Sequence, residues 1–328
     1  MKLRRVIMIF LPVLFLTAAA AICFGSVPIS FAQLMDVFLG NGEEQIALIL
    51  WQLRFPRVLA SLLAGIGLSA AGVLLQCVTG NDLASPNIIG INSGAGLAVI
   101  LMLTVLPTAN KLLPLGAFVG AFGAAMIILV AAHRLGGSRA SILLIGIAIT
   151  TVFNAAISFL SLLDEGVLTQ YNYFTVGSMK AVRLDELLVP GIIIAASFLL
   201  ALAMSGRLGV LCMGDAAAAA LGIRVKRLRI LALACAAACA ASVVSFAGLL
   251  GFVGLVVPHI AKRMVGQRPE RMLITAALIG AIIVLIADLL GRTLFAPSEL
   301  PVGILMSLVG GPYFLILLCR RKRYADLA

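Results

Sequence analysis

The chain has 328 residues, of which 62% are hydrophobic and only 11% are charged. This composition excludes an ordinary soluble domain, in which about 25% of the residues are charged. Windows of about 20 uncharged residues, long enough to span a bilayer core, recur along the whole chain. We therefore expect an all-α, polytopic membrane protein with about ten spans in one domain, residues 1–328. The net charge of +11 does not indicate a nucleic-acid partner, because basic residues of membrane proteins gather in cytoplasmic loops.

Five spans are expected in the first half of the chain, at about 6–26, 58–78, 87–106, 114–132 and 140–163. A signal peptide is the rival interpretation of the first apolar run. At about 20 residues the run has the length of a span rather than of a signal's apolar region, so we expect a retained span. An amphipathic segment at 30–39 predicts an external surface helix. The second expected span is rich in small residues, which predicts a helix buried among others.

The fifth expected span carries polar residues within a few helical turns. Thr150, Thr151, Asn154 and Ser158 can share one face through i±3 and i±4 spacing. They could line a wet translocation path, or they could form hydrogen bonds between helices. The sequence leaves both interpretations open.

The second half begins with a polar connection at 164–186, followed by spans at about 187–204 and 230–249. The next span is expected to end at Pro258, another lies at about 273–290, and the last ends at Cys319. The two histidines lie in separate loops and the six cysteines form no CxxC pair. We therefore expect no metal site and no cofactor in this chain.

A short capped helix is predicted between the sixth and seventh spans, at about 213–224. Asp215 is a good N-cap, Ala216 to Ala220 are the strongest helix formers, and Gly222 suits the left-handed residue that ends a helix. About six residues are too few for a helix that persists alone in water. The segment is therefore either a helix that rests in a groove of another protein or an ordinary connecting loop.

The distribution of basic residues predicts the orientation. With the N-terminus in the cytoplasm, 18 of the 24 lysines and arginines lie on the cytoplasmic side. The six external ones are Arg54, Arg57, Lys111, Lys180, Arg183 and Arg292. This asymmetry favours an even number of spans with both termini in the cytoplasm, which also places the short helix there.

The chain has no G-x4-GK[ST] loop, so it binds no nucleotide in that way. Five segments occur in order: LRFPR (53–57), GNDLASPNIIGINSGAG (80–96), GDAAAAALGI (214–223), GFVGLVVPHIAKRMVG (251–266) and ADLLGRTLFAPSELPVGI (287–304). Together they resemble the permease subunit of the ATP-binding-cassette importers for iron chelates, haem and cobalamin. The resemblance covers the chain nearly end to end.

The resemblance implies a multi-pass transport subunit of the cytoplasmic (inner) membrane that is not itself an enzyme. Its expected partners are a second permease subunit, identical or different, two ATPase subunits that bind ATP and magnesium, and an external substrate-binding protein. The expected cargo is a metal chelate, a ferric siderophore by family frequency, with haem and cobalamin as alternatives. An ion-coupled secondary transporter is the other class, but it needs ionisable residues within the membrane. This chain has almost none in mid-span, and Asp288 lies near a span end with Arg292 at i+4 as a partner, which favours the ATP-driven importer.

The same resemblance implies roles for individual residues. The segment that would seat in the ATPase comprises Gly214, Asp215, Ala216, Ala218, Ala220, Leu221, Gly222 and Ile223. Arg54, Arg57 and Arg292 match positions that meet acidic residues of the binding protein. Their rival roles are snorkelling to the interface for Arg54 and Arg57 and an i,i+4 pair with Asp288 for Arg292. The translocation path is expected along Thr150, Thr151, Asn154 and Ser158. Asp82 departs from the family's usual proline, so the turn there is expected to differ.

Overall fold

The computed structural model describes residues 2–25, 27, 29–87, 90–134, 139–180, 182–296 and 298–325, and all regular structure among them is helical. The expected all-α class is therefore confirmed for this part of the chain. Ile88, Ile89 and Pro297, which belong to the motif segments, lie outside the described residues.

The first half of the chain forms α1 (Leu3–Cys23), α2 (Phe31–Phe38), α3 (Glu44–Leu48), the π-helix η1 (Ile49–Arg54), α4 (Phe55–Thr79), α5 (Ile91–Val105), the short 3-10 helix η2 (Asn110–Leu112), α6 (Leu113–Arg134) and α7 (Arg139–Ser161). The second half forms α8 (Glu165–Val176), α9 (Leu184–Ala203), α10 (Ser205–Cys212), α11 (Asp215–Ala220), α12 (Val225–Ala247), α13 (Val253–Val265), α14 (Pro269–Thr293) and α15 (Val302–Ala325).

Seven helical segments among the described residues are long and apolar enough to cross a membrane: α1, the continuous segment Glu44–Thr79, and the apolar parts of α6, α7, α9, α12 and α14. The expected number of ten spans is not confirmed, because three of the expected spans are short. α5 has 15 residues, α13 has 13, and the apolar part of α15 ends at Ile316. A helix of 15 residues is about 22 Å long, less than the roughly 30 Å of a hydrocarbon core.

The two short helices α5 and α13 begin inside the bundle rather than at its surface. Gly90 precedes α5 with φ 75° and Phe252 precedes α13 with φ 64°, so both helices start from a left-handed residue. A Cβ added to Gly254 in α13 would lie 3.0 Å from the carbonyl oxygen of Leu68, in the middle of α4. Irregular backbone at this depth is tolerated because surrounding helices bury it.

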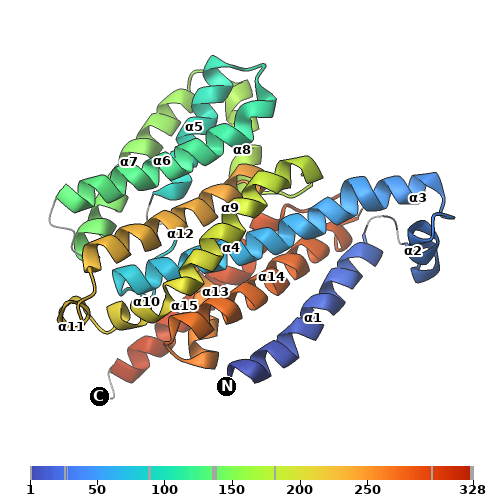
Figure 1. The fold of residues 1–328 in the computed structure, drawn as a ribbon. Helices are drawn as coiled ribbons and strands as arrows, with labels where there is room; N and C mark the ends of the chain where they lie inside the picture. Colours follow the sequence, from blue (N-terminus) through green and yellow to red (C-terminus); the bar gives the residue numbers. More distant parts are fainter. Residues whose placement is uncertain are drawn as a thin grey trace.

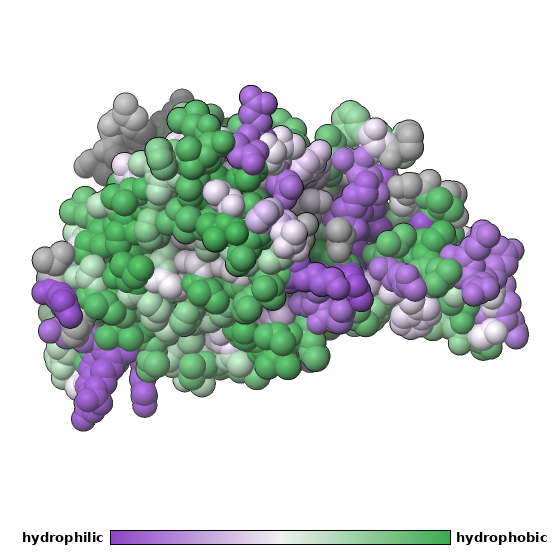
Figure 2. Space-filling model, turned by 90° about the horizontal axis from the view of Figure 1, so that it is seen from above, coloured by the Kyte–Doolittle hydropathy of each residue, from purple (hydrophilic) through white to green (hydrophobic). Residues whose placement is uncertain are grey.

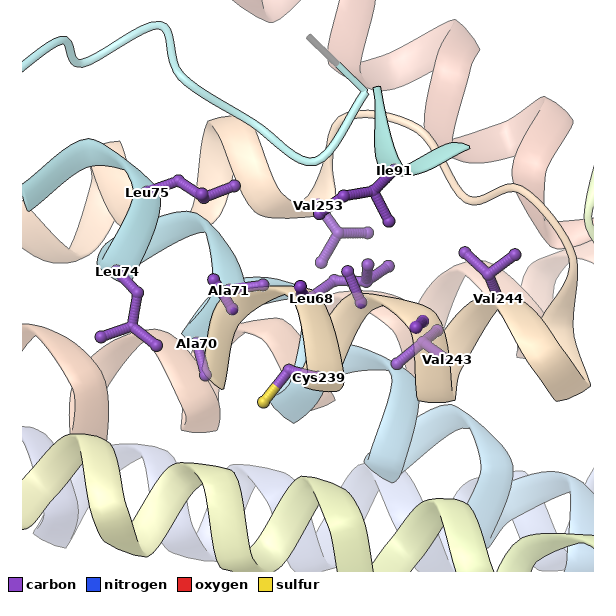
Figure 3. Packing of buried hydrophobic residues seen from close by; sticks show 14 of the residues in the cluster. Leu68, Ala70, Ala71, Leu74, Leu75, Ile91, Cys239, Val243, Val244 and Val253 are labelled. Carbon is purple, nitrogen blue, oxygen red and sulfur yellow. The ribbon is translucent and has the colours of Figure 1, made fainter. Parts of the chain in front are cut away.

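The core lies around α4, which packs against α9, α12, α13 and α14. In Figure 3, Leu68 of α4 lies between Val253 of α13 and Val243 of α12, and Ala71 and Leu75 follow it along α4. Small residues bring the helix axes together, and a Cβ at Gly65 of α4 would collide with the carbonyl oxygen of Gly280 in α14. The expected burial of the second, small-residue-rich span is therefore confirmed.

α1 lies at the edge of the bundle, with 11% of its most apolar window buried, and packs mainly against α14. The two chain ends lie at the same end of the bundle (Figure 1). The face seen in Figure 2 is mostly apolar over the helices, and hydrophilic residues gather toward the ends. This is the surface expected of helices that contact lipid.

Two helices occupy segments that the sequence analysis treats as connections. α8 lies within the polar connection at 164–186 and has Asp164 as its N-cap, whose carboxylate accepts the backbone N–H of Gly166 at 2.7 Å. α10 lies directly before α11. The segment at 30–39, where a surface helix was expected, forms α2.

Candidate functional site

The short helix α11 lies where predicted, but Asp215 is not its N-cap. The N-cap residue is Gly214, with φ 128°, and Asp215 is the first helical residue. Its carboxylate instead binds Nη2 of Arg229 in α12 at 2.8 and 2.9 Å. The Arg229 side chain is 6% exposed, and a buried guanidinium requires a carboxylate more strongly than the exposed first turn of a helix requires a cap.

The C-terminus of α11 closes as predicted. Gly222 has φ 74°, the N–H of Ile223 donates to the carbonyl oxygen of Ala218 at 3.0 Å, and the N–H of Gly222 donates to that of Ala219 at 2.9 Å. These bonds satisfy carbonyl groups that a helix end leaves without partners.

α11 presents a smooth surface outward and is held to the bundle from behind. Ala218 is completely buried, whereas Ala216, Ala220 and Gly222 are exposed. Two larger apolar side chains flank the alanines, Met213 at 78% exposed and Leu221 at 69%. A partner protein would therefore meet small residues between two apolar projections.

The four polar residues of the fifth expected span do not share one face. Thr151, Asn154 and Ser158 are exposed on α7, on a face that the described residues leave uncovered. Thr150 is half-buried and turned toward α5, where its hydroxyl lies 3.5 Å from that of Ser93. The interhelical interpretation therefore fits Thr150, and the face available to a path contains the other three.

Arg54 was expected at the water boundary, but it is buried. Its guanidinium donates to the carbonyl oxygens of Ile22, Cys23 (2.8 Å) and Val27. The last carbonyl groups of a helix have no partner within it, so Arg54 supplies donors to the end of α1.

Arg57 and Arg292 are also buried, in a cluster with two acids. Nε of Arg57 donates to both oxygens of Asp288 at 2.8 and 3.0 Å, and its Nη1 donates to Glu299 at 2.9 Å. Nε of Arg292 lies 3.6 Å from Asp288, and its Nη2 donates to the carbonyl oxygen of Ala21. The i,i+4 pair with Asp288, which is the rival role for Arg292, is therefore present. All three arginines are engaged within the chain, because a buried carboxylate and the end of α1 require these donors.

A further ion pair involves Asp82, the residue that departs from the family pattern. Nζ of Lys262 in α13 donates to its carboxylate at 2.8 and 3.0 Å. The pair borders a cavity of about 100 Å³ that Gln76, Cys77 and Cys212 also line. Sequence reasoning missed this pair and the Asp215–Arg229 pair, because neither has a helical spacing that would indicate contact.

The connection at 164–186 contributes a junction of loops at the opposite end from α11. The N–H of Ser178 donates to the carbonyl oxygen of Ala247 at 2.9 Å, and the N–H of Leu249 donates to that of Phe174 at 3.2 Å. Burial raises the pKa of the phenol of Tyr171 in α8. A cavity of about 380 Å³ lies beside this junction, bordered by α5, α8 and α12.

The described residues contain no group of three or more His, Cys, Asp and Glu side chains placed to hold a metal ion. The exposed surface of α11 is available to a partner protein, and the exposed polar face of α7 is available to a passing solute. The opposite side of α11 is held to the bundle by Arg229, and the opposite side of α7 packs against α5.

Comparison with known proteins places these features in a family. The profile of the FecCD transport family matches residues 13–320. The Fe(3+)-citrate import system permease protein YfmE of Bacillus subtilis is 36% identical over 315 residues, 95% of this chain and 94% of the relative. The hemin transport system permease protein HmuU of Yersinia pestis is 35% identical over 325 residues, 97% and 96% of the two chains.

A solved structure described as a metal-chelate type ABC transporter in an inward-facing conformation has a TM-score of 0.88 at 27% identity. The match covers 97% of this chain and 99% of that chain. The chain belongs to the FecCD transport family, whose members are permease subunits of ABC importers. It is therefore a multi-pass membrane protein of the transport class.

Proposed function

We propose that this chain is the permease subunit of an ATP-driven importer that moves a ferric siderophore into the cytoplasm. Two similar proteins are named for iron chelates, the Fe(3+)-citrate permease above and the iron(3+)-hydroxamate import system permease protein FhuG of Bacillus subtilis, at 36% identity. Haem is the alternative cargo that the hemin permease supports.

The observation that carries the proposal is the surface of α11. The chain has no nucleotide-binding loop of its own, yet it presents a capped helix of small residues fixed from behind by the Asp215–Arg229 pair. Such a surface suits seating in a groove of a separate ATPase. The proposed assembly has two such ATPases, a second permease and an external binding protein.

The proposed path follows the exposed side of α7. Thr151, Asn154 and Ser158 offer hydroxyl and amide groups, and no charge lies among them. A chelate arrives with its metal already coordinated, so the path needs polar lining rather than metal ligands. A second permease facing α7 would enclose this lining.

The external binding protein requires a revised description. Arg54, Arg57 and Arg292 are engaged within the chain. Carboxylates of a binding protein would therefore have to replace Asp288, Glu299 or the carbonyl groups of α1. Docking at these arginines is accordingly proposed as an exchange of partners rather than as the filling of vacant sites.

Uptake by the reconstituted complex tests the function. The permease is purified with its ATPase and binding protein, placed in vesicles, and given radiolabelled ferric citrate, a ferric hydroxamate, haem or cobalamin. We expect ATP-dependent uptake of one ferric siderophore, with little competition from haem or cobalamin. Uptake driven by an ion gradient without the ATPase would identify a secondary transporter instead.

A single substitution tests the role of α11. Leu221→Glu places a charge on its exposed surface and should lower both co-purification of the ATPase and uptake, while the protein still inserts. Leu112→Glu is the matched control, because Leu112 is also an exposed leucine, at 50%. It lies far from α11, next in sequence to Leu113, which lines the cavity at the C-terminal end of α12. Equal ATPase recovery for both variants would contradict the docking role.

A further inference from the structure

The segment that precedes α4 forms a separate structural feature at the end of the bundle opposite α11. α2 begins with a capping box, in which the hydroxyl of Ser30 accepts the N–H of Gln33 at 3.2 Å and the Gln33 side chain accepts the N–H of Ser30 at 2.9 Å. Reciprocal bonds of this kind define a formed helix. α2 packs beside α3, and the two form the outlying lobe at the right of Figure 1.

Three aromatic rings connect α2 to the start of α4. The ring centroids of Phe38 and Trp51 lie 5.8 Å apart, and those of Trp51 and Phe55 lie 5.5 Å apart. We call Phe38, Trp51 and Phe55 the aromatic row. Its members are 59%, 46% and 38% exposed, so the chain itself leaves a large part of each ring uncovered.

Other apolar side chains extend this surface on both sides. Met35 and Leu39 are exposed near Phe38 in sequence, and Leu48 lies one turn before Trp51. Phe24 and Val27, after the end of α1, are 59% and 55% exposed. The lobe and the end of α1, which Arg54 joins to the start of α4, thus both expose apolar side chains.

The helix α2 has the two-sided character of a helix at a membrane surface. Successive helical residues are about 100° apart, so Asp36 and Gln33 lie on the side away from Phe38. In Figure 2 the same lobe, at the right, carries apolar surface beside hydrophilic residues at its tip. The sequence from Phe24 to Leu53 contains no lysine or arginine, so attraction to anionic lipid headgroups does not contribute.

The contacts of Arg54 place the aromatic row relative to the bilayer. Arg54 binds the carbonyl groups at the end of α1. α1 is a largely apolar helix of 21 residues, and its length of about 31 Å matches the thickness of the hydrocarbon core. Cys23 and Arg54 therefore lie near the edge of that core. Trp51 lies three residues before Arg54 in η1, on the side away from α4. It is therefore farther out, at the depth of the headgroups where tryptophan is enriched.

We propose that α2 and the aromatic row form an interfacial anchor. In this arrangement α2 lies in the lipid–water boundary, and its apolar side and the three rings contact the glycerol and upper acyl-chain region of the lipids. The partner is the neutral part of the bilayer surface, and the contact is independent of the transported substrate. It fixes the outer end of the long segment Glu44–Thr79 at the membrane surface.

Fluorescence tests the anchor directly, because Trp51 is the only tryptophan of the chain. The full-length protein is placed in phosphatidylcholine vesicles that carry a doxyl quencher either near the carboxyl end of the acyl chain or near its terminal methyl group. We expect the shallow label to reduce Trp51 emission at least about twofold more than the deep label, because the ring lies at the interface. Aqueous iodide should quench it weakly.

Two results would overturn the proposal. Strong quenching by iodide with no effect of either doxyl label would place the ring in water. Quenching by neither reagent would mean that protein covers it, as with a second copy of the chain.

Substitutions separate lipid contact from folding of the lobe. Phe38→Ser should raise iodide quenching of Trp51 about twofold by loosening the apolar contact, whereas Asp36→Ser, on the polar side of α2, should leave it unchanged. A reporter on α2 itself, Phe38→Trp in a Trp51→Phe background, should show the same shallow doxyl quenching. Equal effects of Phe38→Ser and Asp36→Ser, or a reporter at position 38 quenched only by iodide, would contradict the anchor.

Discussion

Buried arginines in this chain bind groups on helices that are distant in sequence. Arg229 holds α11 through Asp215, Arg57 joins α4 to α14 through Asp288, and Arg54 binds the end of α1. Removal of one partner of such a pair costs more than the pair contributes, because a charge is left in a site without water. These residues therefore give the clearest tests at the scale of single side chains.

The Asp215–Arg229 pair should set the position of α11 under the ATPase. Asp215→Ala and Arg229→Ala should each reduce ATP hydrolysis stimulated by the loaded binding protein, by about tenfold if about 1.4 kcal/mol of positioning is lost. Because the two residues act through one contact, the double variant should be no worse than the poorer single variant. Arg227→Ala, an exposed arginine in the same segment, is the control, and an equal loss there would contradict the positioning role.

The Arg57–Asp288 pair should stabilise the fold. Arg57→Leu should lower the unfolding free energy by about 3–5 kcal/mol. The carboxylate of Asp288 stays buried, loses both hydrogen bonds from Arg57, and keeps only the longer contact with Arg292. Arg183→Ala is the control, because it removes an exposed ion pair in which the side chains of Arg183 and Asp185 are 71% and 66% exposed. This substitution should change the unfolding free energy by about 0–1 kcal/mol. Thermal unfolding in detergent measures both, and similar midpoints would show that the buried cluster does not stabilise the protein.

At the scale of helices, the face of α7 distinguishes a path from packing. In a variant without native cysteines, Thr151→Cys and Asn154→Cys should react with a water-soluble thiol reagent in at least one state of the transport cycle. Thr150→Cys should react much more slowly, because that side chain points toward Ser93 of α5. If positions 151 and 154 stay inert in the resting, ATP-bound and binding-protein-bound complexes, this face packs against protein.

Particular elements show which features the sequence could predict. α2 and α11 were predictable because their signals are local: residues 30–39 have an amphipathic pattern, and Gly222 ends a run of alanines. α8 was missed because its polar composition is typical of a loop. The end of α13 was predicted wrongly, because the span was expected to end at Pro258 but the helix runs from Val253 to Val265 with Pro258 inside it. A proline within a helix is tolerated where neighbouring helices satisfy the freed backbone groups.

The same contrast holds for the candidate site. The place of α11 and the polar character of α7 followed from composition and spacing. The burial of Arg57 did not, since Asp288 and Glu299 lie 231 and 242 residues away in the chain. An arginine beside a proline at a predicted span boundary looks the same in sequence whether it faces water or a distant carboxylate.

For the whole molecule, the charge asymmetry and the position of the chain ends together predict that both termini lie in the cytoplasm. Both ends lie at the same end of the bundle (Figure 1), which agrees with an even number of crossings. A reporter active only in the cytoplasm should therefore be active when fused to either the N- or the C-terminus. A C-terminal fusion active only outside would require an odd number of crossings and would contradict the assigned orientation.

The arginines at the end of α1 also determine an order of events during synthesis. Arg54 lies 31 residues beyond Cys23, whereas Arg292 lies 271 residues beyond Ala21. At about 5–20 residues per second, Arg292 is made about 14–54 s after Ala21. The nascent chain therefore holds its first helix through Arg54 early, and the second bond forms only when most of the protein has left the ribosome.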